Sequence, residues 1–183
     1  MLFIVSLAIG IGAGLVTGGR MDNFANLRVR WPWFVVAALV IREAAVAMPL
    51  SQVDGIQYVY AASLAALIGW TLWHVVRLPG VWLVSAGAAL NLVVILANGS
   101  RMPVAPALAP ILVRHGHIGQ YTVMGPGTNL AWLGDWISFG RIPGVYSPGD
   151  LVSLVGIAVI CFVATRSRAE PGETTRRIVS DPP

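Results

Sequence analysis

Residues 133–154 read LGDWISFGRIPGVYSPGDLVSL, and the interpretation of the whole chain starts from this stretch. It carries two carboxylates, Asp135 and Asp150, among apolar and aromatic residues. Asp150 stands directly before the last strongly apolar run of the chain. The residues upstream of the stretch form several apolar segments of helix length. We therefore expect helices that carry this stretch to one face of a membrane.

The composition supports a membrane protein. Of the 183 residues, 56% are hydrophobic and only 11% are charged, whereas a soluble domain carries about 25% charged residues. All 12 basic residues are Arg, so the chain has no lysine for Schiff-base chemistry. The single cysteine, Cys161, lies in an apolar run and excludes a disulfide within the chain.

The fold class that follows is an all-α integral membrane protein with about five transmembrane helices. A helix needs roughly 20 apolar residues to cross a bilayer. The segments that approach this length are 2–17, 33–48, 58–76, 81–97 and 151–164. The first segment has no basic residues before it and no small-residue cleavage site after it, so we expect a retained helix and not a signal peptide.

Residues 98–150 differ from the helices because they are rich in proline and glycine. Proline at this density prevents a straight spanning helix, so we expect a loop module outside the membrane. Residues 105–113 are apolar but too short to cross, and they either re-enter the bilayer or lie at its surface. Residues 1–165 then form a single transmembrane domain, and the polar tail 166–183 is expected to lack fixed structure.

The arginines predict the orientation in the membrane. With the N-terminus outside, the cytoplasmic segments hold Arg20, Arg28, Arg30, Arg77, Arg166, Arg168, Arg176 and Arg177, and the outer segments hold Arg101, Arg114 and Arg141. Because basic residues concentrate on the cytoplasmic side, we expect a multi-pass protein of a bacterial inner membrane with its N-terminus out and its C-terminus in.

The two aspartates each have a structural and a chemical interpretation. Ser147-Pro148-Gly149-Asp150 before a helix fits a capping box, with Ser at the N-cap and the acid at N3. Asp135, between Leu133-Gly134 and Trp136-Ile137, is either a surface residue beside interfacial tryptophans or a desolvated carboxyl that needs a partner. Two such carboxyls that share a water and one proton can hydrolyse a peptide bond.

The last third of the chain resembles bacterial lipoprotein signal peptidase, a membrane aspartyl peptidase. Gly134-Asp135-Trp136-Ile137 is similar to its V-V-D-F-I segment, and Tyr146-Ser147-Pro148-Gly149-Asp150 to its F-N-x-A-D segment. The residues from Gly87 to Asn91 resemble the first half of its G-x-x-G-N-x-x-D-R patch, although Val94 and Ile95 replace the following Asp-Arg. The resemblance implies Asp135 and Asp150 as the catalytic pair, and we expect Asn91, Asn98 and Arg101 to position the substrate.

The whole chain also resembles an uncharacterised family of small bacterial polytopic membrane proteins. That family has the pattern N-G-x-x-M-P-V followed by L-G-D and S-x-G-D. Residues 98–104, 133–135 and 147–150 fit these three motifs. This resemblance extends over more of the chain and implies no specific activity.

Two further groups of polar residues have alternatives that stay open. Arg42 and Glu43 lie inside the second predicted helix, where they either form structural pairs or line a path for a substrate or protons. His115 and His117 have the spacing of two ligands of one metal, but the sequence supplies no third ligand. We predict no metal site and no cofactor.

Three functions therefore remain after the sequence analysis. The first is a membrane aspartyl hydrolase acting on a lipidated or membrane-anchored substrate. The second is a non-catalytic accessory or assembly subunit that binds a partner membrane protein. The third is a small transporter or lipid-binding protein that uses Arg42 and Glu43. Each places the chain in a lipid bilayer, and none involves nucleic acid.

Overall fold

The computed structural model describes residues 2–26, 33, 37–38, 40–41, 53–76, 78–114, 119–140 and 142–166. Its helices are α1 (Leu2–Val16), η1 (Met21–Asn26), α3 (Ile56–His74), α4 (Val81–Ala97), α5 (Ala109–Arg114), η3 (Ala131–Leu133) and α6 (Pro148–Arg166). Its strands are β1 (Met102–Val104), β2 (Tyr121–Val123), β3 (Ile137–Phe139) and β4 (Ile142–Tyr146).

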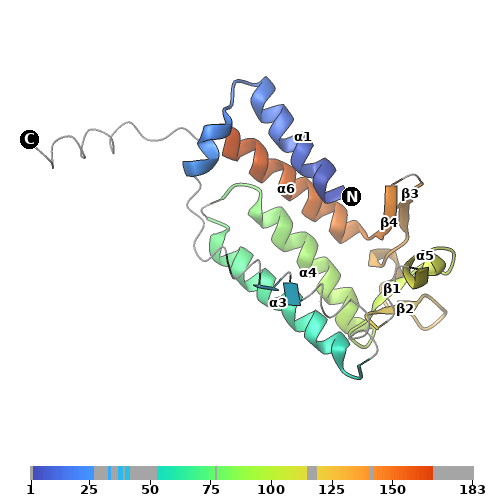
Figure 1. Cartoon of the computed structure of the whole chain (residues 1–183). Coiled ribbons are helices and arrows are strands. Elements are labelled where there is room, and N and C mark those ends of the chain that lie inside the picture. Colours follow the sequence, from blue (N-terminus) through green and yellow to red (C-terminus); the bar gives the residue numbers. More distant parts are fainter. Residues whose placement is uncertain are drawn as a thin grey trace, which may run out of the picture.

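The four long helices that the structure describes lie side by side in the order α1, α6, α4, α3, so that α6 packs on both α1 and α4 (Figure 1). All four strands and α5 gather at one end of these helices (Figure 1). We call the described residues between α4 and α6 the end module. Helix α4 runs toward the end module, whereas α1, α3 and α6 run away from it (Figure 1).

The protein is mostly helical, and two of its described helices are long and apolar enough to cross a membrane. These are α3 and α6, with 19 residues each. Helices α1 and α4 are apolar but have only 15 and 17 residues. Most of the segment 33–48 lies outside the described residues, as does the tail after Arg166. The expectation of about five transmembrane helices is therefore not supported, because few of the described helices reach the required length.

The boundaries of the apolar helices follow the hydropathy of the sequence closely. Helix α4 spans Val81–Ala97, where the sequence predicts 81–97. Helix α6 begins at Pro148, three residues before the apolar run that starts at Leu151. The earlier start has a physical cause, because Ser147 caps the helix and proline is well tolerated in its first turn.

The class all-α is wrong for the end module, which contains two small sheets. Strands β1 and β2 are parallel, with Met102 opposite Tyr121, and β3 and β4 are antiparallel. Most of these strands have only three residues, so they are too short to produce a recognisable alternation of polar and apolar side chains. The many prolines and glycines of the end module thus prevent a long helix but are compatible with short strands.

Part of the segment 105–113 packs within the end module. Its second half forms α5, which contacts β4. Leu112 of α5 belongs to a small buried cluster with Val104 of β1 and Val145 of β4. The helix therefore contributes to a separate core of the end module.

Helices α4 and α6 approach each other at glycines. A Cβ on Gly87 would overlap the carbonyl oxygen of Gly149 and the Oγ of Ser153. A Cβ on Gly156 would lie 2.7 Å from the backbone nitrogen of Val84. Small residues at such positions let the backbones of membrane helices come into contact. The spacing of Gly149 and Gly156 by one heptad keeps both residues on the same face of α6.

Helix α1 contacts the opposite face of α6 in the same way. A Cβ on Gly10 would overlap Ala158, and a Cβ on Gly14 would overlap Thr165. At the end remote from the end module, the backbone nitrogen of Arg20 donates to the carbonyl of Thr165 over 2.8 Å. Helix α6 is therefore the central helix, fixed on one side by α1 and on the other by α4.

We predict that Gly87→Ala lowers the free energy of unfolding by about 1–3 kcal/mol, because the added methyl group forces α4 and α6 apart. Gly69→Ala in α3 is the matched control, because a Cβ at Gly69 meets no atom within 4 Å. The control should leave the stability unchanged or raise it slightly. Thermal unfolding in detergent micelles measures both, and equal melting temperatures would contradict the close approach.

Candidate functional site

The carboxylate of Asp150 lies in the first turn of α6, and the expected capping box is present. The backbone nitrogen of Asp150 donates to the Oγ of Ser147 over 3.0 Å. In return, the backbone nitrogen of Ser147 donates to the Oδ2 of Asp150 over 2.9 Å. These reciprocal bonds satisfy two backbone donors at the start of the helix. They also fix the direction in which the carboxylate points.

Asn91 of α4 connects this cap to the neighbouring helix. Its Nδ2 donates to the Oδ1 of Asp150 over 2.8 Å, and its Oδ1 accepts from the Oγ of Ser147 over 2.8 Å. The amide reaches the cap because Gly149 has no side chain, since a Cβ there would overlap the Oδ1 of Asn91. Both oxygens of Asp150 are therefore held by donors from two different elements. We call Asn91, Ser147 and Asp150 the polar knot.

Asp135 is positioned by the backbone of β1. Its nitrogen donates to the carbonyl of Pro103 over 2.8 Å, and its carbonyl accepts from the nitrogen of Ala105 over 2.9 Å. These bonds pair Asp135 with Val104 in an isolated bridge on the side of β1 away from β2. Asp135 is 3% exposed. The interpretation as a surface residue in water is therefore wrong.

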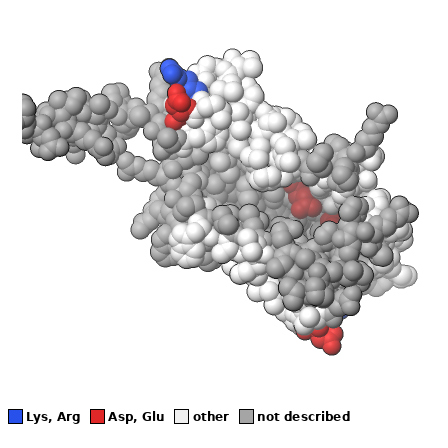
Figure 2. Space-filling model, viewed as in Figure 1, with Lys and Arg blue, Asp and Glu red and all other residues white. Residues whose placement is uncertain are grey.

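The two aspartates line the same cavity, which has a volume of about 320 Å³. Asn91 also lines it. The cavity lies where the end module meets the helices, and its wall includes Ser153 of α6 and Met102 of β1. In Figure 2, acidic atoms lie in a recess on the viewed face, away from the charged groups at the two ends of the molecule. The cavity thus has a lining that is polar at the two aspartates and Asn91.

Three tyrosines of the cavity wall were not predicted from the sequence. They are Tyr60 of α3, Tyr121 of β2 and Tyr146 of β4. A tyrosine hydroxyl can donate and accept a hydrogen bond, which makes it suitable for orienting a polar substrate group. No local motif marks these residues, because they come from three separate elements that meet only in the folded chain.

Asn98 and Arg101 do not line this cavity. The amide of Asn98 instead pairs with the backbone of Asn129, donating to its carbonyl and accepting from its nitrogen, each over 2.9 Å. It therefore holds a loop of the end module against the end of α4. Arg101 is exposed. Other residues singled out in the sequence, Arg42, Glu43, His115 and His117, lie outside the described residues.

The chemistry available in this cavity is that of two carboxyl groups, an amide and phenolic hydroxyls. A pair of carboxyls that cannot both ionise holds one proton, so one group acts as a base and the other as an acid. The polar knot fixes the direction of the Asp150 carboxylate, and the β1 bridge fixes the backbone of Asp135. Such preorganisation is a requirement for acid–base catalysis.

The comparisons with known proteins identify a family. The model of DUF5317, a family of unknown function, matches residues 26–162. The chain therefore belongs to this family, and the prediction of an uncharacterised family is confirmed. No curated protein and no solved structure matches the chain.

We predict that Ser147→Ala lowers the free energy of unfolding by about 1–2 kcal/mol, since it removes an N-cap and a partner of Asn91. Ser153→Ala is the matched control in the same helix, because its hydroxyl makes only a long bond of 3.5 Å to Val84. Chemical or thermal unfolding in micelles measures both variants. If the control loses as much stability as Ser147→Ala, the polar knot does not hold α6.

Proposed function

We propose that this member of DUF5317 is a membrane-embedded aspartyl hydrolase with Asp135 and Asp150 as its catalytic pair. One observation carries the proposal: two carboxylates that are 15 residues apart in the chain line one cavity of about 320 Å³ together with Asn91. The similarity of their flanking motifs to lipoprotein signal peptidase supports the same assignment. The substrate class is a lipidated or membrane-anchored molecule.

The proposed reaction needs no group beyond the side chains of the chain and one water. The ionised carboxylate takes a proton from the water, whose oxygen attacks the carbonyl carbon of the scissile amide. The protonated carboxyl polarises the carbonyl oxygen as a tetrahedral intermediate forms. The carbon–nitrogen bond then breaks, and the leaving nitrogen takes up a proton from the pair. Asn91 acts as a positioning residue because it holds the Oδ1 of Asp150.

We also propose that the chain crosses the membrane several times, with the end module outside. Helices α1 and α4 lie alongside α3 and α6, which are long and apolar enough to span. Trp132 and Trp136 of the end module are 65% and 51% exposed, as expected at a membrane interface. The preponderance of arginines in the segments assigned to the inside gives the orientation, with the N-terminus out.

A second candidate function is that of an accessory subunit without catalysis. The observation that favours it is the capping box, which accounts for the Ser147–Asp150 bonds without any reaction. In that case Asp150 serves the stability of α6, and the exposed apolar faces of the helices bind a partner. The two functions differ in one expected result: loss of one carboxylate stops cleavage of a substrate only if the protein is a hydrolase.

We predict that Asp135→Asn and Asp150→Asn each lower the cleavage rate of a membrane-anchored precursor by about 100-fold or more, because each removes half of the acid–base pair. Immunoblots of cells that carry each variant measure the uncleaved precursor. Asp54→Asn, which changes an exposed acid before α3, should behave like the wild type. Wild-type processing in both site variants would exclude the hydrolase and leave the accessory subunit.

The topology is tested with single cysteines in a Cys161→Ala background. Ala107→Cys lies on the exposed surface of the end module, and Met21→Cys lies on the exposed surface at the opposite end. We expect a membrane-impermeant maleimide to label the first in intact cells and the second only after permeabilisation. The reverse pattern would overturn the orientation.

A further inference from the structure

The described helices share an exposed apolar surface. On α3, every exposed side chain within residues 59–73 is apolar, and the same holds for α4 within residues 82–97. On α1, all exposed side chains within residues 3–16 are apolar. We call these exposed side chains, together with Val155 of α6, the apolar belt.

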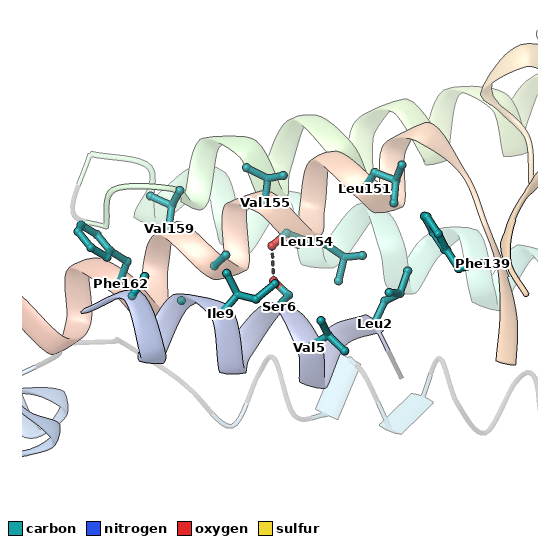
Figure 3. Close-up of a pocket in the computed structure, with 13 residues that line it drawn as sticks. Leu2, Val5, Ser6, Ile9, Phe139, Leu151, Leu154, Val155, Val159 and Phe162 are labelled. Carbon is teal, nitrogen blue, oxygen red and sulfur yellow. Dashed lines mark hydrogen bonds between the residues drawn. The ribbon is translucent and has the colours of Figure 1, made fainter. Parts of the chain in front are cut away.

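A groove between α1 and α6 continues the apolar belt from one helix to the other. Its lining extends from Phe139 of β3 at one end to Phe162 of α6 at the other (Figure 3). Ser6 is the one hydroxyl-bearing residue in the lining, and its hydroxyl donates to the carbonyl of Leu154 (Figure 3). Because this hydroxyl is already hydrogen-bonded within the protein, it is compatible with a hydrocarbon environment.

The charged side chains that the structure describes lie outside the apolar belt. The end remote from the end module holds Arg20, Asp22 and Arg166, the end nearer to it holds Asp54 and Arg101, and the cavity holds Asp135 and Asp150. On the face shown in Figure 2, charged atoms accordingly lie at the two ends and in the recess. The apolar belt is therefore bounded by charge at both of its edges.

Exposed tryptophans also mark the two edges. Trp73 at the end of α3 and Trp82 at the start of α4 are 67% and 57% exposed, and both lie at the end remote from the end module. In the end module, Trp132 belongs to η3, which contacts α4, and its carbonyl accepts from the indole nitrogen of Trp136 over 2.9 Å. Tryptophan concentrates where hydrocarbon meets water. These two pairs indicate that lipid covers the surface between them.

The apolar belt is shorter than the hydrocarbon core of an ordinary bilayer. Helices α4 and α1 have 17 and 15 residues, so at about 1.5 Å per residue they measure about 25 and 22 Å. Helix α6 measures about 24 Å between its charged residues Asp150 and Arg166. An ordinary core is about 30 Å thick, and any tilt of the helices reduces the thickness that they span. The mismatch is thus about 5 Å or more.

We infer that the apolar belt fits a bilayer whose hydrocarbon core is about 22–25 Å thick, and that a thicker bilayer thins around α1 and α4. The inference rests on the proposed multi-pass topology and does not depend on the hydrolase. In a thick bilayer, the helix ends would expose backbone groups without partners to hydrocarbon. Local thinning of the lipid is the smaller cost. The short length of α1 and α4 then reflects the bilayer that the chain fits.

The first test measures how well lipids of different chain length cover the apolar belt. The full-length protein is reconstituted with dioleoyl phosphatidylcholine brominated in mid-chain, which quenches tryptophan fluorescence on contact, and unbrominated phosphatidylcholines are added as competitors. We expect the dimyristoleoyl lipid to protect the tryptophans at least about twofold better than the longer dierucoyl lipid, because its shorter chains match the belt.

Two results of this competition would overturn the inference. Equal protection by the dimyristoleoyl, dioleoyl and dierucoyl lipids, or best protection by the dierucoyl lipid, would mean that the belt is not matched to a thin bilayer. Absence of quenching in every bilayer would mean that the belt does not contact lipid, and the proposed spanning topology would then fail as well.

The second test measures where the bilayer surface meets the helices, with single cysteines in a Cys161→Ala background. Trp82→Cys and Leu96→Cys place a bimane label near the two ends of α4, and Ala66→Cys places one midway along the exposed face of α3 as a control. A nitroxide on the lipid headgroup should quench the labels at positions 82 and 96 equally in dimyristoleoyl and dioleoyl bilayers, because the bilayer thins to the belt. The control label should be quenched weakly in both.

A bilayer that keeps its own thickness gives a different result. The labels at positions 82 and 96 would then lie deeper in dioleoyl bilayers, and their quenching by the headgroup nitroxide would fall by about half or more. That result would overturn the inference. Strong quenching of the label at position 66 would also overturn it, because the middle of the belt would then not lie in hydrocarbon.

The aspartate variants separate this inference from the proposed hydrolase. If Asp135→Asn and Asp150→Asn process precursors normally while short-chain lipids still protect the tryptophans best, the hydrolase fails and the thickness match remains. If both variants lose cleavage while all three lipids protect equally, the hydrolase remains and the thickness match fails.

Discussion

The close contact of α4 with α6 is the constraint on which the site depends. Gly87, Gly149 and Gly156 let the two backbones touch, because a Cβ at any of them would overlap the other helix. Only at this distance can the amide of Asn91 reach both Ser147 and Asp150. A single packing feature thus sets the separation of two helices and the direction of a carboxylate. Wider spacing would leave buried polar groups without partners, at a cost of about 1–3 kcal/mol each.

Helix α4 also helps to position the second carboxylate, that of Asp135. Strand β1 follows α4 after a short turn, and it fixes Asp135 through the backbone of Pro103 and Ala105. Both aspartates are therefore positioned relative to the same helix, one across the α6 contact and the other through the end module. An apolar groove between α1 and α6 shares the lining residues Leu2 and Leu154 with the cavity.

Hydropathy and local motifs predicted the parts of this arrangement that depend on neighbours in the chain. The apolar run 81–97 is a helix with those bounds, and the Ser147–Asp150 capping box is present. Contacts between distant segments were not predictable in the same way. The strands of the end module are too short to leave a pattern, and Tyr60 enters the cavity only through tertiary packing. Asn98 was expected to position the substrate, yet its amide is hydrogen-bonded to the backbone of Asn129.

The central claim is that Asp135 and Asp150 act together on one tetrahedral centre. The most direct measurement is the affinity of the purified protein for an acylated peptide that carries a hydroxyl-bearing analogue of the tetrahedral intermediate, because such analogues bind about 10²–10⁸-fold more tightly than substrates. The account predicts that the analogue raises the melting temperature of the wild type, and that Asp135→Asn and Asp150→Asn each weaken its binding at least about tenfold. Equal affinity of the analogue for the wild type and for both single variants would contradict the account.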